Sequence, residues 1–572
     1  MKITKKGVQE RLEFFRTLYE NAKHSYADKL EAFDRNMKQY KGSDEIDGGE
    51  RAIAVRNITY EIIESQISSD IPQPKADPEY YSEERGRLAE AIEALCRSLR
   101  DKLPFEELND LDERYTYIYG GSIWFAEWDN TESFGGIHGG VKVHCLSPRN
   151  FIPEPGVYNI EDMEYCFLSF TATRAEISRK YGIHGEALLR LDSDMGNIDS
   201  SDDGDTATVT VTFYKNEEGE VSQFIFSGDV TLLDIEGYYK RKLTLCRSCG
   251  LTADECRCER PRTYSVNVDT ERVGTDKVIG DVPYYTPRRF PIVVRKNTSA
   301  ETCLLGQSDC EYIRPEQQAI NKVESRILQK LLRSGITPIV PEDATISINN
   351  SVFGQIIKMK PGETVSQYGT VDTTPDISQD IAEAERLYEH SKRILGISDA
   401  FQGISESSNE SGYARQLRIS QSSGRLESKK KMKHTAYAAL DRIIFEHYLA
   451  FADETRCLDY KDAFGRVRSI SFNKHDFLVY DPEERCFRYD DTYLFSVDLN
   501  GGSEYQRETL WQRNLENLNA GTLGDPHSPI TLLRYWQCQE RAHYPYARDN
   551  VEYFTELIAK GREYDEKIQG SV

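Results

Sequence analysis

The chain has 572 residues, a length typical of two to four domains or of one large elaborated unit. Its composition, 38% hydrophobic and 29% charged residues, fits a soluble globular protein. Its formal net charge of −23 excludes a general nucleic-acid coat protein, which would be basic, but leaves open a protein that surrounds DNA and must not adhere to it. There is no run of about 18 apolar residues, so we expect no membrane-spanning helix. The N-terminus lacks the apolar core of a signal peptide, so we expect the protein to be made and used in a reducing cytosol.

Helices are predicted at the start of the chain. Between residues 8 and 40, apolar side chains such as Leu12, Phe15 and Tyr19 recur at intervals of three and four, which is the period of one helix face. The same period predicts further helices over residues 53–69, 81–101 and 104–117.

Strands follow these helices. We expect strands at residues 122–128, 141–145 and 164–170, and again from 207 to about 245, where the first eight residues alternate strictly. Thr173 is expected to cap a short helix that ends at Gly182. The acidic, serine-rich stretch 192–205 is expected to be a disordered loop.

Four cysteines form a C-x2-C-x6-C-x-C cluster, made of Cys246, Cys249, Cys256 and Cys258. Four thiolates this close together can close a tetrahedral site, and zinc is the metal that such a site prefers in a reducing compartment. Because protein atoms would fill all four positions, the predicted Zn²⁺ site is structural, a compact knuckle at the end of a hairpin. Two local disulfides or four idle thiols are the alternatives.

The second half of the chain alternates between helices and short strands. A helix is expected over residues 317–332 with Pro315 just before it, followed by short strands at 336–340, 345–348 and 355–360. A helix over residues 376–396 then ends at Gly396. After a polar loop at 397–411, a long helix is expected to run from about residue 412 to residue 452. Later strands are expected at 466–472 and 493–499, and a helical tail with breaks at 519–521 and 525–529. The fold class is therefore predicted to be α+β.

Basic residues gather at the start of that long helix. Residues 411–434 carry seven Lys and Arg against one Glu, a local net charge of +6 in a strongly acidic chain. The stripe could face phosphates, or it could be a solvated face or a partner for acidic neighbouring subunits. Six of these seven are the candidate contact residues: Arg415, Arg418, Arg425, Lys429, Lys430 and Lys433. No aromatic residues interleave with them, so stacking on single strands is not expected.

Signatures of catalysis are missing from the sequence. No G-x-x-x-x-G-K-[ST], H-E-x-x-H or G-x-S-x-G motif is present, and carboxylate pairs such as Asp490 and Asp491 are ordinary in a chain with 95 acidic residues. We therefore expect a protein that is not an enzyme.

Several motifs in fixed order resemble those of one family. Residues 147–156 (Ser-Pro-Arg-Asn-Phe-Ile-Pro-Glu-Pro-Gly), 161–165 (Glu-Asp-Met-Glu-Tyr) and 173–177 (Thr-Arg-Ala-Glu-Ile) are similar to the succession SP-x-x-F-x-P-D-P, E-D-A-x-Y and T-x-E-E-I of portal proteins. The chain departs from that pattern at Glu154, Met163 and Ala175.

Two later segments extend the likeness. Gly306-Gln-Ser before residues 313–321 resembles the family's G-x-S and P-x-Q-x-x-I-N, and residues 411–414 resemble its SG-x-A. The order holds over about residues 10–520, so the chain resembles a portal protein, the head-to-tail connector, of a tailed bacteriophage or prophage. The cysteine knuckle is not part of this pattern and looks like an insertion.

The resemblance implies a portal-type fold that forms a ring, normally of twelve subunits. Its regions would be an α+β wing (1–310 and 453–502), stem helices (311–334 and 376–396), a small β-containing clip (335–375), a tunnel loop (397–411), a long helix under the crown (412–452) and a helical crown (503–572). It also implies a place at one capsid vertex of the virion, after assembly in the cytoplasm of a host bacterium, where double-stranded DNA is packaged and later ejected. The implied partners are the large terminase subunit, a head-tail adaptor, and the major capsid and scaffolding proteins, with no membrane.

The resemblance also implies two sets of contact residues. In the tunnel loop, the residues that would line the DNA channel are Gln402, Ser405, Ser407, Ser408 and Asn409. In the clip, the residues that would bind the adaptor are Thr345, Asn349, Asn350, Gln355 and Lys358. A zinc-dependent nucleic-acid enzyme (a nuclease or a motor subunit) and a virion structural protein that does not contact DNA are the alternative interpretations.

Overall fold

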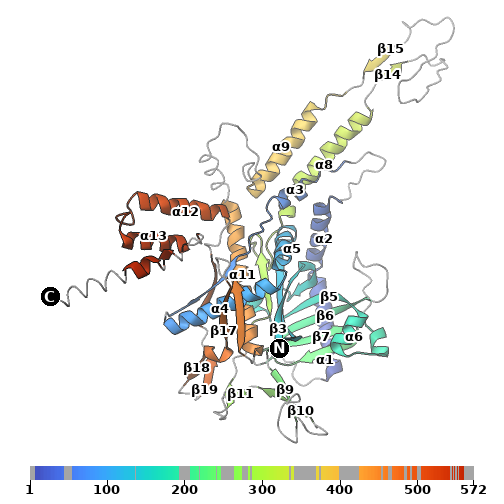
Figure 1. Ribbon diagram of the computed structural model, residues 1–572. Helices are drawn as coiled ribbons and strands as arrows, with labels where there is room; N and C mark the ends of the chain where they lie inside the picture. Colours follow the sequence, from blue (N-terminus) through green and yellow to red (C-terminus); the bar gives the residue numbers. More distant parts are fainter. Residues whose placement is uncertain are drawn as a thin grey trace. The chain divides into compact units, whose positions relative to one another are not determined.

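The computed structural model falls into two units, one of residues 1–31, 67–307 and 427–572 (unit 1) and one of residues 32–66 and 308–426 (unit 2) (Figure 1). It describes residues 7–43, 54–80, 82–134, 137–191, 206–217, 219–239, 241–246, 263–268, 270–272, 281–283, 287–333, 336–339, 369–372, 375–397, 424–452, 455–461, 467–481, 486–489, 492–498, 504–541, 544, 547, 550–551 and 553–558. Both helices and sheets are present, which confirms the predicted α+β class.

A five-stranded antiparallel sheet lies in unit 1 with helix α1 (Val8–Ser25) on one face. In sheet order its strands are β4 (Phe151–Pro153), β5 (Tyr165–Thr173), β6 (Thr206–Lys215), β7 (Val221–Ser227) and β8 (Val230–Ile235). Phe15 of α1 stacks on Phe224 with ring centroids 4.8 Å apart, and Leu12 and Tyr19 on the same face are buried. The apolar period found in the sequence is therefore the packed face of α1.

Of two predicted helices near this sheet, one is divided in the structure and the other is confirmed. The helix expected over residues 8–40 is two helices, because Tyr26 leaves helical dihedrals (φ −99°, ψ 2°) between α1 and α2 (Ala27–Lys41). The short helix α6 (Arg174–Tyr181) starts with a capping box in which Thr173 and Glu176 satisfy each other's backbone N–H groups, so the predicted cap is confirmed.

The main core of unit 1 surrounds a three-stranded antiparallel sheet, ordered β13 (Ile292–Lys296), β2 (Gly121–Phe134) and β3 (Ile137–Leu146). Helices α4 (Glu83–Lys102), α5 (Phe105–Tyr119) and α11 (Gly424–Phe451) contribute side chains to this core. Trp124 of β2 is fully buried at its centre, with its ring 5.8 Å from Phe105 and 5.4 Å from Tyr437. The helices predicted over residues 81–101 and 104–117 are confirmed within about two residues, and β2 and β3 are longer than the predicted strands 122–128 and 141–145. The predicted end of the long helix is confirmed, and its predicted start lies outside the described residues.

Smaller elements complete unit 1. Its two-stranded antiparallel pairs are β1 (Gln73–Pro78) with β20 (Tyr493–Asp498), β9 (Arg241–Cys246) with β10 (Thr263–Val268), β11 (Thr270–Arg272) with β12 (Asp281–Pro283), β16 (Arg456–Lys461) with β17 (Val467–Phe472), and β18 (Leu478–Asp481) with β19 (Cys486–Tyr489). The remaining helices are α7 (Glu186–Leu189), α12 (Glu504–Asn519), α13 (Pro529–Arg541) and the short 3-10 turns η1 (Pro148–Asn150), η2 (Ile160–Asp162) and η4 (Lys474–Phe477). The predicted breaks in the helical tail fall between α12 and α13.

Two backbone segments of unit 1 cross at glycines. Gly120 ends α5 in the left-handed region (φ +90°), and a Cβ there would lie 2.3 Å from the carbonyl oxygen of Gly306. A Cβ on Gly306 would in turn lie 2.4 Å from the carbonyl oxygen of Thr298. Both positions therefore require glycine, one for conformation and space, the other for space.

Unit 2 contains a pair of long helices, α8 (Asp309–Arg333) and α9 (Ser378–Leu395), which lie side by side (Figure 1). The carboxylate of Asp380 on α9 joins them, because it pairs with Arg326 (2.5 Å) and Lys330 of α8. Apolar residues of α8, α9 and the short helix α3 (Ile58–Glu64) form a common cluster. Strands β14 (Ile336–Ile339) and β15 (Gly369–Asp372) pair antiparallel.

The structure changes two helix boundaries predicted in unit 2. α3 is shorter than the expected 53–69, because the side chain of Asn57 caps its start by accepting from the N–H of Tyr60 (3.0 Å). α8 starts eight residues before the expected Gln317, with Pro315 inside it. Side chains hold these extra turns: Gln66 donates to the Asp309 carboxylate (3.0 Å), and Gln39 donates to the Cys310 carbonyl (3.1 Å).

Some expected elements lie outside the described residues, namely the strands at 345–348 and 355–360, the loop 192–205 and the helical residues 412–423. No helix among the described residues is long and apolar enough to span a membrane.

Candidate functional site

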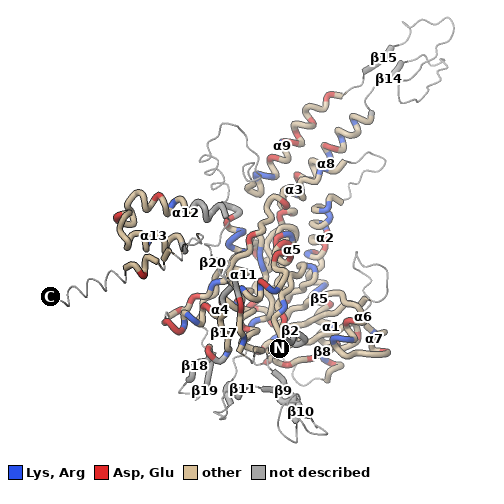
Figure 2. The backbone as a smooth tube through the Cα atoms, viewed as in Figure 1, with Lys and Arg blue, Asp and Glu red and all other residues tan. Residues whose placement is uncertain are grey.

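The candidate site is built on helix α11, which carries Lys429, Lys430 and Lys433 of the basic residues singled out in the sequence (Figure 2). Its buried face includes Lys429, Lys433, Tyr437, Leu440 and Ile444, spaced by four, four, three and four residues. One continuous helix face therefore starts with two lysines and continues with apolar side chains. The two lysines point into unit 1 because they share a face with its core residues.

Lys433 is held by two oxygen atoms. Its ammonium group lies 3.0 Å from Oε1 of Glu113 on α5 and donates a hydrogen bond of 2.6 Å to the backbone carbonyl of Asp70. The side chain is only 5% exposed, and that of Glu113 only 1%. Burial lowers the pKa of Lys433 from its usual value, although the negative charge of Glu113 opposes this shift.

Glu113 belongs to a cluster of four buried charges. Arg295 of β13 lies 2.8 Å from Oε1 of Glu113 and also pairs with Asp112. Burial alone would raise the pKa of Glu113, but the positive charges of Arg295 and Lys433 outweigh that effect and lower it. Two carboxylates and two cations balance, so the cluster as a whole is neutral. Removing one member would leave an unpaired buried charge, at a cost of about 3–5 kcal/mol.

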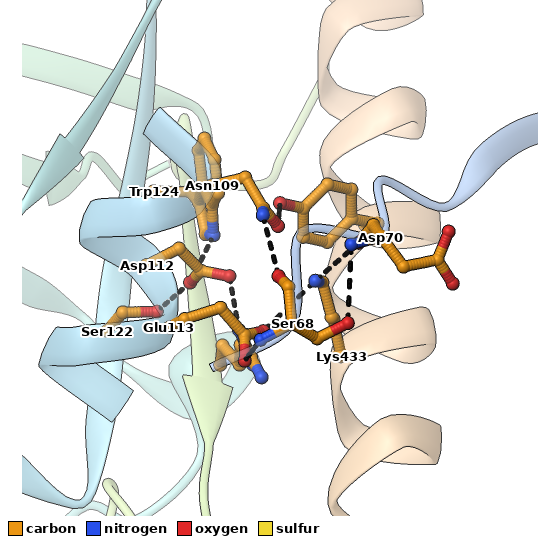
Figure 3. A network of polar contacts seen from close by, with 10 residues as sticks. Ser68, Asp70, Asn109, Asp112, Glu113, Ser122, Trp124 and Lys433 are labelled. Atoms are coloured by element: carbon orange, nitrogen blue, oxygen red, sulfur yellow. Dashed lines mark hydrogen bonds and ion pairs between the residues drawn. The ribbon is translucent and has the colours of Figure 1, made fainter. Parts of the chain in front are cut away.

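Neutral groups complete the network shown in Figure 3. Asp112 accepts hydrogen bonds from the hydroxyl of Ser122 and from the indole N–H of Trp124 (3.0 Å), both on β2. Asn109 accepts from the Tyr437 hydroxyl (2.9 Å) and donates to the carbonyl of Ser68 (3.0 Å). The network therefore joins five segments of unit 1: α5, β2, β13, the stretch 68–70 and α11.

Further along α11, two more buried acids pair with arginines. Asp441 receives two hydrogen bonds from Arg100 of α4, at 2.6 and 2.7 Å, and Glu446 lies 2.8 Å from Arg289. Each pair fixes one turn of α11 against a different segment of unit 1. The arrangement holds a helix in place and offers no open coordination site, and within the described part of the chain no group of three or more His, Cys, Asp or Glu side chains could hold a metal ion.

The structure separates the predicted basic residues. Lys429 and Lys433 are buried, whereas Lys430 is exposed, and so is Lys431, which pairs with Glu427 (3.2 Å). The prediction of a side chain that faces DNA or a neighbouring subunit is therefore kept for Lys430 and not for Lys429 and Lys433. Arg415, Arg418 and the side chain of Arg425 lie outside the described residues.

The other predicted contact residues cannot be compared with the structure. The tunnel-loop set (Gln402 to Asn409), the clip set (Thr345 to Lys358) and three of the four cysteines lie outside the described residues, and so does the side chain of Cys246. The flanking strands are described: β9 and β10 pair antiparallel, with Cys246 opposite Thr263.

The acidic partners of the lysines were missed by the sequence analysis. Asp112 and Glu113 lie on a helix with other acids, and nothing in their spacing distinguishes them. For Lys429 and Lys433 a signal exists, because they lie eight and four residues, respectively, before Tyr437. Following the apolar face of the helix back toward its N-terminus would have placed both lysines inside.

The comparison with protein families agrees with this architecture. One family model, described as phage P22-like portal protein, matches residues 57–454, which is more than half of the chain and runs from just before α3 to just after α11. No curated protein matches the chain. The resemblance to portal proteins predicted from the motifs is confirmed, and the chain belongs to the family of phage P22-like portal proteins, which are structural rather than catalytic proteins of the bacteriophage virion.

Proposed function

We propose that copies of this chain assemble into a ring of twelve at one vertex of a phage capsid, and that double-stranded DNA passes through this ring during packaging and ejection. The observation that carries the proposal is the family match over residues 57–454, since portal proteins in general form homo-oligomeric rings with capsid and terminase partners. In this role the ring docks the large terminase subunit first and a head-tail adaptor afterwards.

The paired helices α8 and α9 support the assignment of chain segments to the regions of a portal-type fold. An antiparallel helix pair joined through residues 334–377 suits a stem that carries a clip at its end. We assign the stem to these helices, the clip and its adaptor contacts to residues 335–375, the tunnel loop to 397–411 and the crown to 503–572. The wing then takes the sheets of unit 1.

The charge of the chain supports DNA passage rather than tight DNA binding. Each phosphate contact adds affinity that depends on salt, and many such contacts would stall a moving duplex. A net charge of −23 per chain keeps most surfaces non-adhesive. The exposed basic residue Lys430 can centre the duplex without holding it.

The mass of the purified protein tests the ring. Native mass spectrometry is expected to give a species near twelve times 65.6 kDa, and electron microscopy a ring with a central hole. A stable monomer that cleaves DNA in the presence of a metal ion would reject the portal role and favour a zinc-dependent nuclease. A ring that packages and retains DNA normally after deletion of residues 397–411 would reject the tunnel-loop assignment alone.

We also propose one structural Zn²⁺ per chain, bound by Cys246, Cys249, Cys256 and Cys258. The pairing of Cys246 with Thr263 supports this site, because it brings the two ends of the cysteine-bearing segment together. Elemental analysis of protein purified under reducing conditions is expected to give about one zinc per chain and much less for Cys249→Ser. The control Cys457→Ser, at an exposed cysteine outside the cluster, is expected to keep the metal. Wild-type protein without zinc would contradict the site.

A further inference from the structure

Helix α11 changes its mode of packing along its length. We call residues 427–435 its head and residues 436–451 its tail. In the tail, the buried side chains that belong to the core are mostly large and apolar: Tyr437, Leu440, Ile443, Ile444, Phe445, Tyr448 and Leu449. In the head, the buried side chains are Lys429 and Lys433.

The head is therefore attached by charges rather than by apolar burial. Lys433 pairs with Glu113 and the Asp70 carbonyl, and the ammonium group of Lys429 lies 4.8 Å from the ring centroid of Tyr117. Ionic and hydrogen-bonded contacts exchange for contacts with water, so their net contribution is small next to that of buried apolar side chains. The two parts of one helix thus differ in how strongly they are held.

Glu113 has two partners besides Lys433. It lies 2.8 Å from Arg295, and its other carboxylate oxygen accepts a hydrogen bond from the backbone N–H of Ser68 (3.3 Å). When the head moves away, the carboxylate keeps these two partners, but Arg295 then faces both Asp112 and Glu113, so one negative charge of the cluster is no longer balanced. The ammonium group of Lys433 gains water at the same time, so each group of this ion pair still has polar partners after opening.

We propose that Glu113 is a positioning residue for the basic head of α11, and that the head detaches from unit 1 as one segment while the tail stays packed. The head carries the exposed Lys430 and Lys431, so its attachment sets where these charges lie. This inference goes beyond the proposed DNA passage, because it requires neither the ring nor DNA.

Hydrogen exchange of the full-length protein, followed by mass spectrometry, tests the attachment. In Glu113→Gln, the exchange of peptides within 427–435 is expected to rise about tenfold more than that of peptides within 440–450. Lys433→Met is a second variant with the same expected result, which it reaches by removing the cation while keeping an apolar stem beside Tyr437. Unchanged exchange of the head in both variants, or equal acceleration of head and tail, would overturn the proposal.

Asp441→Asn provides the matched control, because it breaks a buried ion pair with Arg100 in the tail. We expect this variant to speed the exchange of head and tail together, since it weakens the packed part of the helix. Acceleration confined to the head in this control would mean that the head merely reports any loss of stability, and would likewise overturn the proposal.

Discussion

At the scale of single residues, His447 shows what deep burial does to a titrating group. Its ring is fully buried, and its Nδ1–H donates to the carbonyl of Ile443 (2.8 Å). The rings of Tyr238, Tyr239 and Phe451 lie within 5.3–6.1 Å of it. Burial among these rings lowers the pKa of His447 from 6.5 to about 4. The imidazole is therefore neutral in the folded protein at neutral pH.

This shift predicts a pH dependence of stability. Between pH 6.5 and 4 the unfolded chain takes up a proton at this position and the folded protein does not, so stability falls as the pH is lowered through that window. A difference of about 2.5 pH units corresponds to a loss of about 3 kcal/mol. Denaturant titrations of His447→Phe are expected to show a loss smaller by that amount between pH 6.5 and pH 4. Replacing the exposed His24 by Asn should leave the loss as in the wild type, and the same slope in all three proteins would contradict the assignment.

Gly120 and Gly182 form a natural pair for a second test at this scale. Both end a helix in the left-handed region, at φ +90° and φ +68°, but a Cβ on Gly182 would meet nothing within 4 Å. Gly182→Ala is expected to cost about 1 kcal/mol for the backbone conformation alone. Gly120→Ala adds a collision with the Gly306 carbonyl and is expected to cost about 3 kcal/mol or more. Chemical denaturation measures both, and equal costs would show that the crossing relaxes.

At the scale of elements, periodicity predicted most helices and strands because it reports which face is buried. The departures have local causes that periodicity does not contain. Pro315 looks like a helix start, yet side chains of Gln39 and Gln66, distant in sequence, support the turns before it. Asn57 caps α3, so the helix starts at Ile58 although the apolar pattern begins at residue 53.

The candidate site was predicted less well than the elements, because the number of basic residues was considered and not the side of the helix on which each one lies. Seven basic residues in one segment suggested one exposed stripe, but the helix turns Lys429 and Lys433 into the core and leaves Lys430 exposed. The partner carboxylate of Lys433 lies more than 300 residues away in sequence, on α5. No local rule can pair such residues, which is why the ionic network emerged only from the fold.

The pair formed by α8 and α9 carries a prediction of its own. Asp380 bridges Arg326 and Lys330 across the two helices, whereas Glu383 pairs with Arg386 on its own helix. In Asp380→Ala, amide hydrogen exchange near residues 326–330 and 380–384 is expected to be faster by about threefold to tenfold. Glu383→Ala should leave the exchange of α8 unchanged. Equal behaviour of the two variants would mean that the ion pairs do not join the helices.

At the scale of the whole molecule, the acidic charge bears on assembly. Each chain carries −23, so bringing twelve copies together concentrates like charge. Dissolved salt screens such repulsion, with a screening length of about 30 Å at 0.01 M and about 8 Å at 0.15 M. The buried ion pairs of α11 lie within one chain and are screened much less. Salt should therefore act mainly between chains.

This argument gives the proposed ring a definite response to salt. At a fixed chain concentration, the fraction of protein in the ring is expected to rise when NaCl is raised from about 0.01 to about 0.15 M, as measured by sedimentation velocity. The circular dichroism of the protein should stay constant over that range, which serves as a control for folding. A ring fraction that falls with salt would mean that ion pairs between neighbours outweigh the overall repulsion. The exposed, basic Lys430 would then be a first residue to replace in search of those contacts, because it is free of the buried network that holds Lys433.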